Sequence, residues 1–146
     1  MKKIKIVLVF ILVPFLLIQF IPVNRDNPPI DNSLALTVPS NVEKILKNSC
    51  YDCHSNETIW PAYSYVAPVS WLVSRDVKFG REELNFSEWN KMTEEKRLHK
   101  KDEIIEEISR ETMPMPIYLL THPSASLSDE DKLIIKNWLT GRETLN

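Results

Sequence analysis

Residues 49–61 read SCYDCHSNETIWP, and they contain the two cysteines of the chain, Cys50 and Cys53. A histidine, His54, directly follows the second cysteine, so the spacing is C-x-x-C-H. Cysteines this close in sequence form a disulfide, a redox pair, part of a zinc site or the attachment point of a prosthetic group. Which of these applies depends on the compartment and on what the rest of the chain supplies.

The N-terminus indicates export. Lys2, Lys3 and Lys5 precede residues 6–21, which carry no charge and a single polar side chain, Gln19. A basic start before an apolar run is typical of a signal peptide or a membrane anchor. The run reaches 18 residues at position 23, close to the ~20 needed for a span, and no small-residue cleavage site follows. We therefore predict an uncleaved anchor over residues 1–23, rather than a cleaved signal peptide, with the domain on the periplasmic side of the cell envelope.

Charge and composition exclude several classes of protein. Without the three N-terminal lysines the chain has 15 Lys and Arg against 20 Asp and Glu, a net charge of −5. Nucleic-acid-binding domains are basic, so this negative charge argues against that class. Two glycines in the whole chain exclude Gly-rich phosphate-binding loops.

Residues 24–39, rich in Pro and Asn, predict an extended linker. Residues 40–146 predict one small domain whose modest core a bound cofactor would help.

Two helices are predicted in the first half of the domain. Ser40 and Glu43 form a capping-box pattern, which starts a helix that runs to Cys50. Pro68 suits the first turn of a second helix, and Gly80 is a candidate to stop it. No segment has a convincing strand pattern.

Two more helices are predicted in the second half. Thr93 starts a charged helix with an apolar stripe, whose polar face we expect to be solvated. Ser128 and Asp131 form a weaker capping box at the start of the last helix, and Gly141 ends it. The sequence therefore predicts an all-α domain.

C-x-x-C-H in an exported helical chain favours one covalently attached haem c. Each cysteine adds to a haem vinyl group as a thioether, and the histidine presents its imidazole to the iron. A disulfide across two residues closes too small a loop to stabilise much, and a redox pair requires a βαβ surround. A zinc site requires four ligands, and the remaining histidines, His99 and His122, have no finger spacing.

Candidates for the sixth iron ligand lie in residues 111–123, ETMPMPIYLLTHP. Met113 and Met115 each precede a proline, and His122 is the rival that would give a bis-histidine site. Alternate residues of an extended Met-Pro-Met-Pro run point to opposite sides, so a single methionine can face the iron. We predict Met113, which follows the third helix directly, with Met115 facing away toward the packing of Tyr118.

An aromatic and proline-rich segment is the candidate cover for the haem edge, because flat apolar side chains shield it from water. The alternative is that these residues form an ordinary core. The candidates are Trp60, Pro61, Tyr65, Pro68 and Trp71. Arg75 and Arg81 are candidates to pair with the haem propionates.

The chain resembles a known family through several motifs in order: the C-x-x-C-H, then WP.YS, APVSWL, NFSEW and MP..Y...HP. It is similar to the bacterial haem-binding domain family, small c-type cytochrome-like proteins with a single CxxCH motif. The resemblance implies a helical fold similar to class I cytochrome c, with Cys50 and Cys53 as attachments. It also implies His54 as the proximal ligand and Met113 on the far side of the haem.

Three functions are compatible with these residues. The leading one is an electron carrier that is tethered to the membrane and exchanges electrons with redox proteins of the cell envelope, because a six-coordinate iron has no open substrate site. The alternative is a haem enzyme or a gas or redox sensor with an open or displaceable sixth position. A domain in which haem is mainly structural is the third. The residues leave the oligomeric state open.

Overall fold

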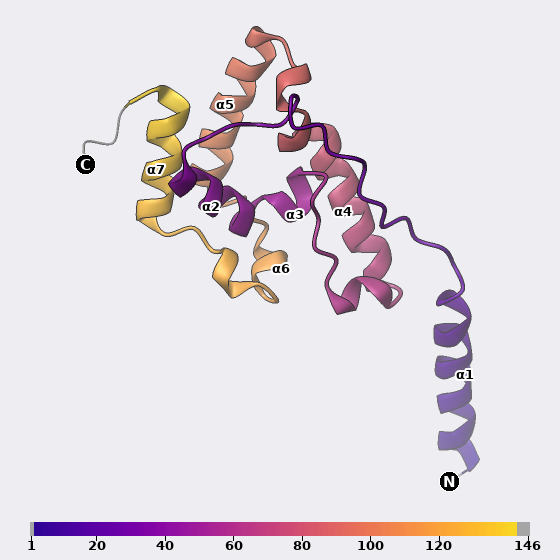
Figure 1. The fold of residues 1–146 in the computed structure, drawn as a ribbon. Coiled ribbons are helices and arrows are strands. Elements are labelled where there is room, and N and C mark those ends of the chain that lie inside the picture. Colours follow the sequence, from indigo (N-terminus) through magenta and orange to yellow (C-terminus); the bar gives the residue numbers. More distant parts are fainter. Residues whose placement is uncertain (1, 143–146) are drawn as a thin grey trace.

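The computed structural model describes residues 2–142, and every regular element in that range is a helix (Figure 1). The prediction of an all-α chain is confirmed for this part; residues 143–146 of the predicted domain lie outside it. The α-helices are α1 (Lys2–Ile18), α2 (Ser40–Ser49), α3 (Tyr51–His54), α4 (Val69–Glu83), α5 (Glu94–Ser109), α6 (Pro116–Leu119) and α7 (Asp129–Thr140). Three 3-10 helices join them: η1 (Ala62–Tyr65), η2 (Phe86–Lys91) and η3 (Pro123–Ala125).

The first helix, α1, projects away from the rest of the molecule (Figure 1). It is 17 residues long, contains Pro14 and exposes apolar side chains along its length. Within residues 2–142, no helix combines the length and the apolarity required to cross a bilayer. This finding does not support the predicted membrane anchor.

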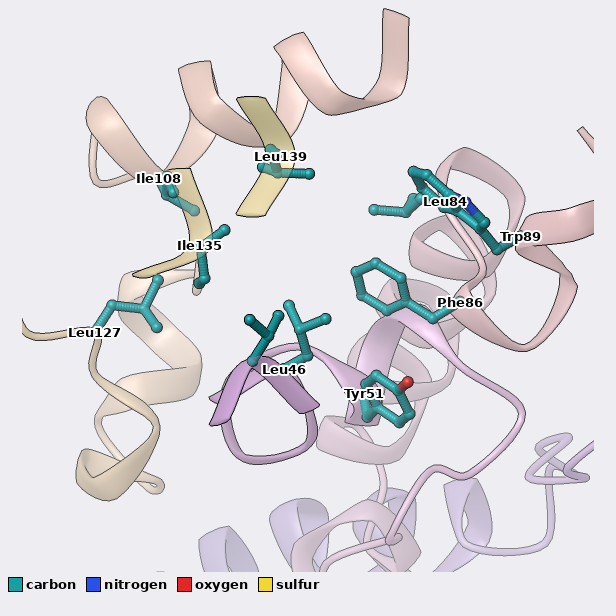
Figure 2. Close-up of a cluster of buried hydrophobic side chains, with 10 residues drawn as sticks. Leu46, Tyr51, Leu84, Phe86, Trp89, Ile108, Leu127, Ile135 and Leu139 are labelled. Atoms are coloured by element: carbon teal, nitrogen blue, oxygen red, sulfur yellow. The ribbon is translucent and has the colours of Figure 1, made fainter. Parts of the chain in front are cut away.

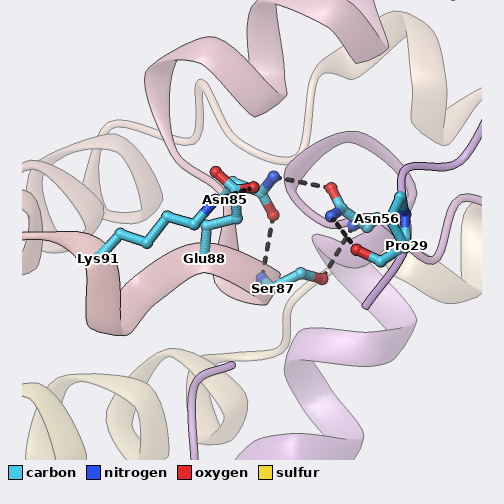
Figure 3. Close-up of polar contacts among 6 residues, drawn as sticks. All are labelled: Pro29, Asn56, Asn85, Ser87, Glu88 and Lys91. Atoms are coloured by element: carbon cyan, nitrogen blue, oxygen red, sulfur yellow. Dashed lines mark hydrogen bonds and ion pairs between the residues drawn. The ribbon is translucent and has the colours of Figure 1, made fainter. Parts of the chain in front are cut away.

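Residues 24–39, here called the strap, are extended as predicted but run along the domain. The Leu36 amide donates to the Phe86 carbonyl at 2.8 Å, and the Asn90 amide donates to the Leu34 carbonyl at 2.9 Å. Figure 3 shows a further contact, in which the Asn56 side chain donates to the Pro29 carbonyl at 3.4 Å. The strap is thus held against the helices.

The polar cluster beside the strap joins the segment after the C-x-x-C-H motif to η2 (Figure 3). The Asn85 side chain donates to Asn56 Oδ1 at 2.8 Å, and the Asn56 amide donates to the Ser87 hydroxyl at 2.9 Å. Asn85 also caps η2 by accepting from the Ser87 amide at 3.0 Å. Asn56 and Ser87 are buried, so these bonds satisfy polar groups that water does not reach.

Side-chain caps are present in two of the three places where the sequence predicts them, and the helix predicted to start at Ser40 does begin there. The Thr93 hydroxyl accepts from the Lys96 amide at the start of α5, and Ser128 and Asp131 form a reciprocal capping box on α7. Gly141 ends α7 with φ of 68°, a left-handed conformation that glycine adopts without strain. The capping box predicted at Ser40 is wrong: Ser40 is the first helical residue, Pro39 precedes it, and no side chain caps α2.

The core lies between α2, α5, α7 and η2 (Figure 2). Its aromatic part is a row of three rings: Tyr51 stacks on Phe86 at 5.4 Å between centroids, and Phe86 lies 6.4 Å from Trp89. The buried side chains of the cluster are Val42, Leu46, Tyr51, Leu84, Phe86, Trp89, Ile108, Leu127, Ile135 and Leu139. This core holds α2 and α3 in place, and with them the C-x-x-C-H motif.

Candidate functional site

The C-x-x-C-H motif forms a single tight turn at α3. The amides of Cys53 and His54 both donate to the Cys50 carbonyl, at 3.2 and 2.9 Å. Both cysteines are free thiols and both line a cavity, as does the imidazole of His54. The turn therefore brings the three predicted side chains to one wall.

Helix α4 packs closely on this turn because it has a glycine at the contact. A Cβ atom at Gly80 would lie 2.6 Å from the Cys53 carbonyl oxygen, a distance that real contacts do not reach. The prediction that Gly80 stops the helix is wrong, since α4 continues to Glu83. Gly80 is needed for the close approach of the backbone, and α4 ends three residues later.

The orientation of His54 is fixed by two backbone acceptors, one in α4 and one directly after its last residue. Its Nδ1 lies 2.9 Å from the Gly80 carbonyl oxygen and 3.0 Å from that of Leu84. Carbonyl oxygens only accept, so Nδ1 carries the proton and shares it between them. Burial lowers the pKa of His54, although these two hydrogen bonds oppose the shift. The neutral ring is therefore in the tautomer that keeps the Nε2 lone pair free for a metal.

The cavity beside this turn has a volume of about 760 Å³ and a mainly apolar wall. That volume lies within the range of ~300–1,000 Å³ usual for cofactor sites. It reaches into the centre of the domain, because six of its lining residues also belong to the core. Figure 2 shows these side chains, which are Leu46, Leu84, Phe86, Ile108, Leu127 and Ile135.

Both methionines of the loop between α5 and α6 line the cavity. Met113 is 36 % exposed, and Met115 is half-buried directly before the first residue of α6. The expectation that Met115 faces away is therefore not met. His122 is not among the lining residues: its ring stacks on Tyr118, with centroids 4.2 Å apart and planes within 11°.

Tyr118 on α6 connects the methionine loop to the C-x-x-C-H turn. Its hydroxyl donates to Asp52 Oδ2 at 2.8 Å, and Asp52 stands between the two cysteines. Burial and this hydrogen bond raise the pKa of Tyr118, so the phenol remains a donor. Residues from α3 and α6 thus meet across one side of the cavity.

Lys100 of α5 is another wall residue, and it is 7 % exposed although its neighbours are charged surface positions. It contacts Glu83 and lies 2.7 Å from Glu103. Burial lowers the pKa of Lys100, but the hydrogen bonds to the two carboxylates outweigh it and the net pKa is raised. The expectation of a wholly solvated polar face on this helix is therefore wrong at Lys100.

Comparison with protein families gives a match over most of the chain. The family described as the haem-binding domain matches residues 13–141. The chain belongs to the haem-binding domain family. Haem is therefore its cofactor, and the suspected resemblance is confirmed. Searches of curated proteins and of solved structures found no match.

The residues of this haem-binding domain fit such a group. The apolar wall suits the porphyrin faces, and the free lone pair on His54 Nε2 suits the iron. Burial raises the pKa of Cys50 to about 12 and that of Cys53 to about 11. Both thiols are therefore protonated at neutral pH in the folded chain.

The five residues that were predicted to shield the haem edge do not line the cavity. They are Trp60, Pro61, Tyr65, Pro68 and Trp71. Trp60 and Trp71 have buried indole N–H groups that find no acceptor within the described part of the chain. These five residues belong to η1, its flanks and the start of α4.

The predicted propionate partners are also engaged elsewhere. Arg75 pairs with Asp76 at 2.9 Å on the surface. Arg81 donates to the Ser55 and Asp26 carbonyl oxygens and to Asn27, so its guanidinium holds the strap. Neither arginine lines the cavity.

Sequence reasoning missed four features of the site: Gly80, Lys100, Phe79 and the Tyr118–Asp52 bond. The scarcity of glycine was a usable signal, because one of two glycines in a chain of 146 residues lies in the interior of a helix. Glycine there costs about 1 kcal/mol relative to alanine, so its presence indicates a close contact. The Tyr118–Asp52 bond joins residues 66 positions apart and has no local pattern.

Proposed function

We propose that this haem-binding domain carries one covalently attached haem c and serves as an electron carrier of the cell envelope. The observation that supports it most is the shared wall of two free thiols and a histidine with its Nε2 free. When bound, the group supplies a one-electron ferric–ferrous couple. The fold proposed around it is similar to class I cytochrome c.

The roles of the residues follow from their positions. Cys50 and Cys53 would hold the group through two thioethers: each S–H bond would be replaced by an S–C bond to one vinyl carbon, and the hydrogen would end on the other carbon of that vinyl group. No oxidant is needed for this addition. Both free thiols line the cavity, where they would meet the group.

His54 is the proposed proximal ligand, and Gly80 and Leu84 orient it through their carbonyl groups. Hydrogen bonding to Nδ1–H makes the ring more basic and fixes its plane. Met113 is the proposed ligand on the other side, with Met115 as the alternative on the same wall. Thioether ligation favours ferrous iron relative to a second histidine.

A location at the membrane suits this role. Support comes from the lysines at the N-terminus and from the apolar, exposed surface of α1. The domain would then meet redox proteins of the cell envelope while tethered close to them.

The test is a pyridine haemochrome spectrum of protein matured in a host with c-type assembly machinery. Haem should stay with the polypeptide through acid-acetone extraction and on a denaturing gel. The variant Cys50→Ala with Cys53→Ala should release it, and Trp60→Phe is a matched control that keeps both thiols. Haem that is extracted from the unsubstituted protein contradicts covalent attachment.

A further inference from the structure

Two segments of the domain, residues 58–74 and residues 112–128, contain no Asp, Glu, Lys or Arg, and the first of them meets the end of α1. Residues 58–74 read TIWPAYSYVAPVSWLVS, in a chain with 38 charged residues. Five large apolar or aromatic side chains of this segment are between 41 % and 78 % exposed. We call these five the apolar face: Ile59, Tyr65, Val66, Val69 and Leu72.

The end of α1 is bound to this segment at two atoms of one residue. The Ala67 amide donates to Gln19 Oε1 at 2.9 Å, and Gln19 Nε2 donates to the Ala67 carbonyl at 3.2 Å. Ala67 is buried between Val66 and the start of α4. The single polar side chain of the N-terminal apolar run is therefore used to attach α1 to the domain.

The first residues of the strap strengthen this junction. Arg25 donates to the Ser64 carbonyl at 3.2 Å, and its guanidinium lies 4.5 Å from the centre of the Tyr65 ring. The Ser74 hydroxyl donates to the Asn24 carbonyl at 2.7 Å. Figure 1 shows the result: α1 leaves the domain beside η1 and the start of α4.

We propose that the apolar face is a membrane-contact surface that seats the domain on the lipid bilayer into which α1 inserts. This inference rests on the proposed membrane location and names the surface that completes it. α1 exposes apolar side chains along its length, and the apolar face continues that surface onto the domain. Tyrosine and tryptophan prefer the interfacial layer of a bilayer, and this segment has two of each.

Contact of the apolar face with lipid would also set the position of the cavity relative to the bilayer. Val69 lies in the first turn of α4, whereas Phe79 and Gly80 of the same helix line the cavity. Ten residues of α-helix separate Val69 from Phe79, which is about 15 Å along the axis. Seating the start of α4 on the lipid therefore holds the cavity above the surface, open to partners in the aqueous phase.

The experiment is photolabelling of the full-length holoprotein in liposomes that contain a phospholipid with a diazirine in its upper acyl chain. Mass spectrometry of the digest measures the label in α1, in residues 58–74 and in α7. Leu133 of α7 is 57 % exposed and provides the comparison for an apolar side chain remote from α1. We expect residues 58–74 to carry about fivefold more label than the α7 peptide, as for an apolar face buried in the interface.

Two variants test the contact itself. Val69→Glu with Leu72→Glu should cut the label in residues 58–74 about threefold and leave that in α1 unchanged, whereas the control Leu133→Glu should change neither. Label in α1 alone overturns the membrane-contact surface but leaves the proposed membrane location standing. No label in α1, together with failure to float with liposomes, overturns the location as well. A crosslinked dimer that protects residues 58–74 in liposomes assigns the face to a second copy and also overturns the proposal.

Discussion

Among single residues, Gly80 sets the distance between α4 and the C-x-x-C-H turn. Its missing side chain makes room for the Cys53 carbonyl, and its own carbonyl accepts the His54 Nδ1 proton. One position therefore controls both the packing of the turn and the orientation of the imidazole. A methyl group added there must displace backbone atoms, which cannot rotate away as a flexible side chain does.

We expect Gly80→Ala to destabilise the holoprotein despite the better helix propensity of alanine. Propensity favours Ala by about 1 kcal/mol, whereas overpacking costs typically 1–3 kcal/mol, and a backbone contact lies at the upper end. The net loss of about 1–2 kcal/mol is measurable by guanidinium denaturation. The reduction potential should shift as well, because the His54 hydrogen bond changes.

Gly141→Ala is the matched control for this prediction. Gly141 has a φ of 68° and no neighbour within 4 Å of an added Cβ, so the cost there is backbone strain of about 1 kcal/mol. The potential should be unchanged, because Gly141 is at the end of α7. Equal stability and potential for Gly80→Ala and the parent protein would contradict the role assigned to Gly80.

The second prediction at this scale concerns the distal ligand. Met113→Ala should remove the weak near-infrared band of oxidised methionine-ligated haem and let the ferrous iron bind carbon monoxide. Met115→Ala should do neither, although both residues line the cavity. The reverse pattern reassigns the ligand to Met115. Absence of the band from the parent protein argues for an open sixth position instead.

For single residues, the sequence predicts well the positions of side chains that are close along the chain. It predicts contacts between distant parts of the chain poorly. Cys50, Cys53 and His54 meet on one wall because they lie within five consecutive residues of one tight turn. Trp60 and Trp71 look equally suitable by chemistry, yet they are absent from that wall. Their position depends on how the segment after the turn folds back, and side-chain type carries no information about that path.

Among the elements, α6 is held against the C-x-x-C-H turn by a single side-chain hydrogen bond. α6 has four residues and no buried side chain, so it has little packing of its own. Tyr118 supplies the connection by donating to Asp52 at 2.8 Å, and the stack of His122 on its ring supports it from behind. The methionine loop leads directly into α6, so this bond positions both candidate ligands.

We therefore predict that Tyr118→Phe loosens the distal side of the haem. A hydrogen bond of this kind contributes about 1 kcal/mol, so opening of the loop should become about fivefold more frequent. Carbon monoxide should bind the ferrous protein faster by about the same factor. Tyr118 acts here as a positioning residue.

Tyr63→Phe is the control for this prediction. The Tyr63 hydroxyl lies 3.3 Å from His122 Nδ1 and does not contact Asp52. The binding rate should stay within twofold of the parent, and the near-infrared band should persist. Equal acceleration in both variants would show that the aromatic cluster, and not the bond to Asp52, holds the loop.

Elements with local end signals are predictable from this sequence, and those with tertiary ends are not. α5 and α7 begin at Thr93 and Ser128 because a hydroxyl and a nearby amide satisfy each other within one turn. α2 begins without a side-chain cap, and α4 passes through Gly80 to end at Glu83. α2 nevertheless begins at Ser40 as predicted, whereas Gly80 serves the contact with the C-x-x-C-H turn and does not end α4.

The molecule as a whole is built around its cavity. Six side chains of the buried cluster also line the cavity, so core and cofactor site share one wall. The strap is joined to the helices through the polar cluster of Asn56, Asn85 and Ser87 (Figure 3). An extended, Pro-rich composition predicts the shape of the strap but not its docking, which depends on backbone hydrogen bonds to η2.

The last prediction is that the domain folds cooperatively when haem fills this cavity and loses that cooperativity without it. Six core side chains line this cavity, and without the cofactor their cavity-facing surfaces have no packing partner. Apolar surface that stays in contact with water or with a void does not contribute to the free energy of folding as buried surface does. The haem-free chain is therefore expected to collapse around the cavity and to lose fixed packing.

Cys50→Ser with Cys53→Ser, prepared without haem, should keep helical far-ultraviolet circular dichroism but lose its near-ultraviolet signal and its sharp thermal transition. Adding haemin should restore part of the transition, because a ligand that binds the native state stabilises it. His99→Ala, a change at an exposed position of α5, should leave the holoprotein transition unchanged. A haem-free double variant that melts as sharply and at the same temperature as the holoprotein would show that the cavity wall is rigid without its cofactor.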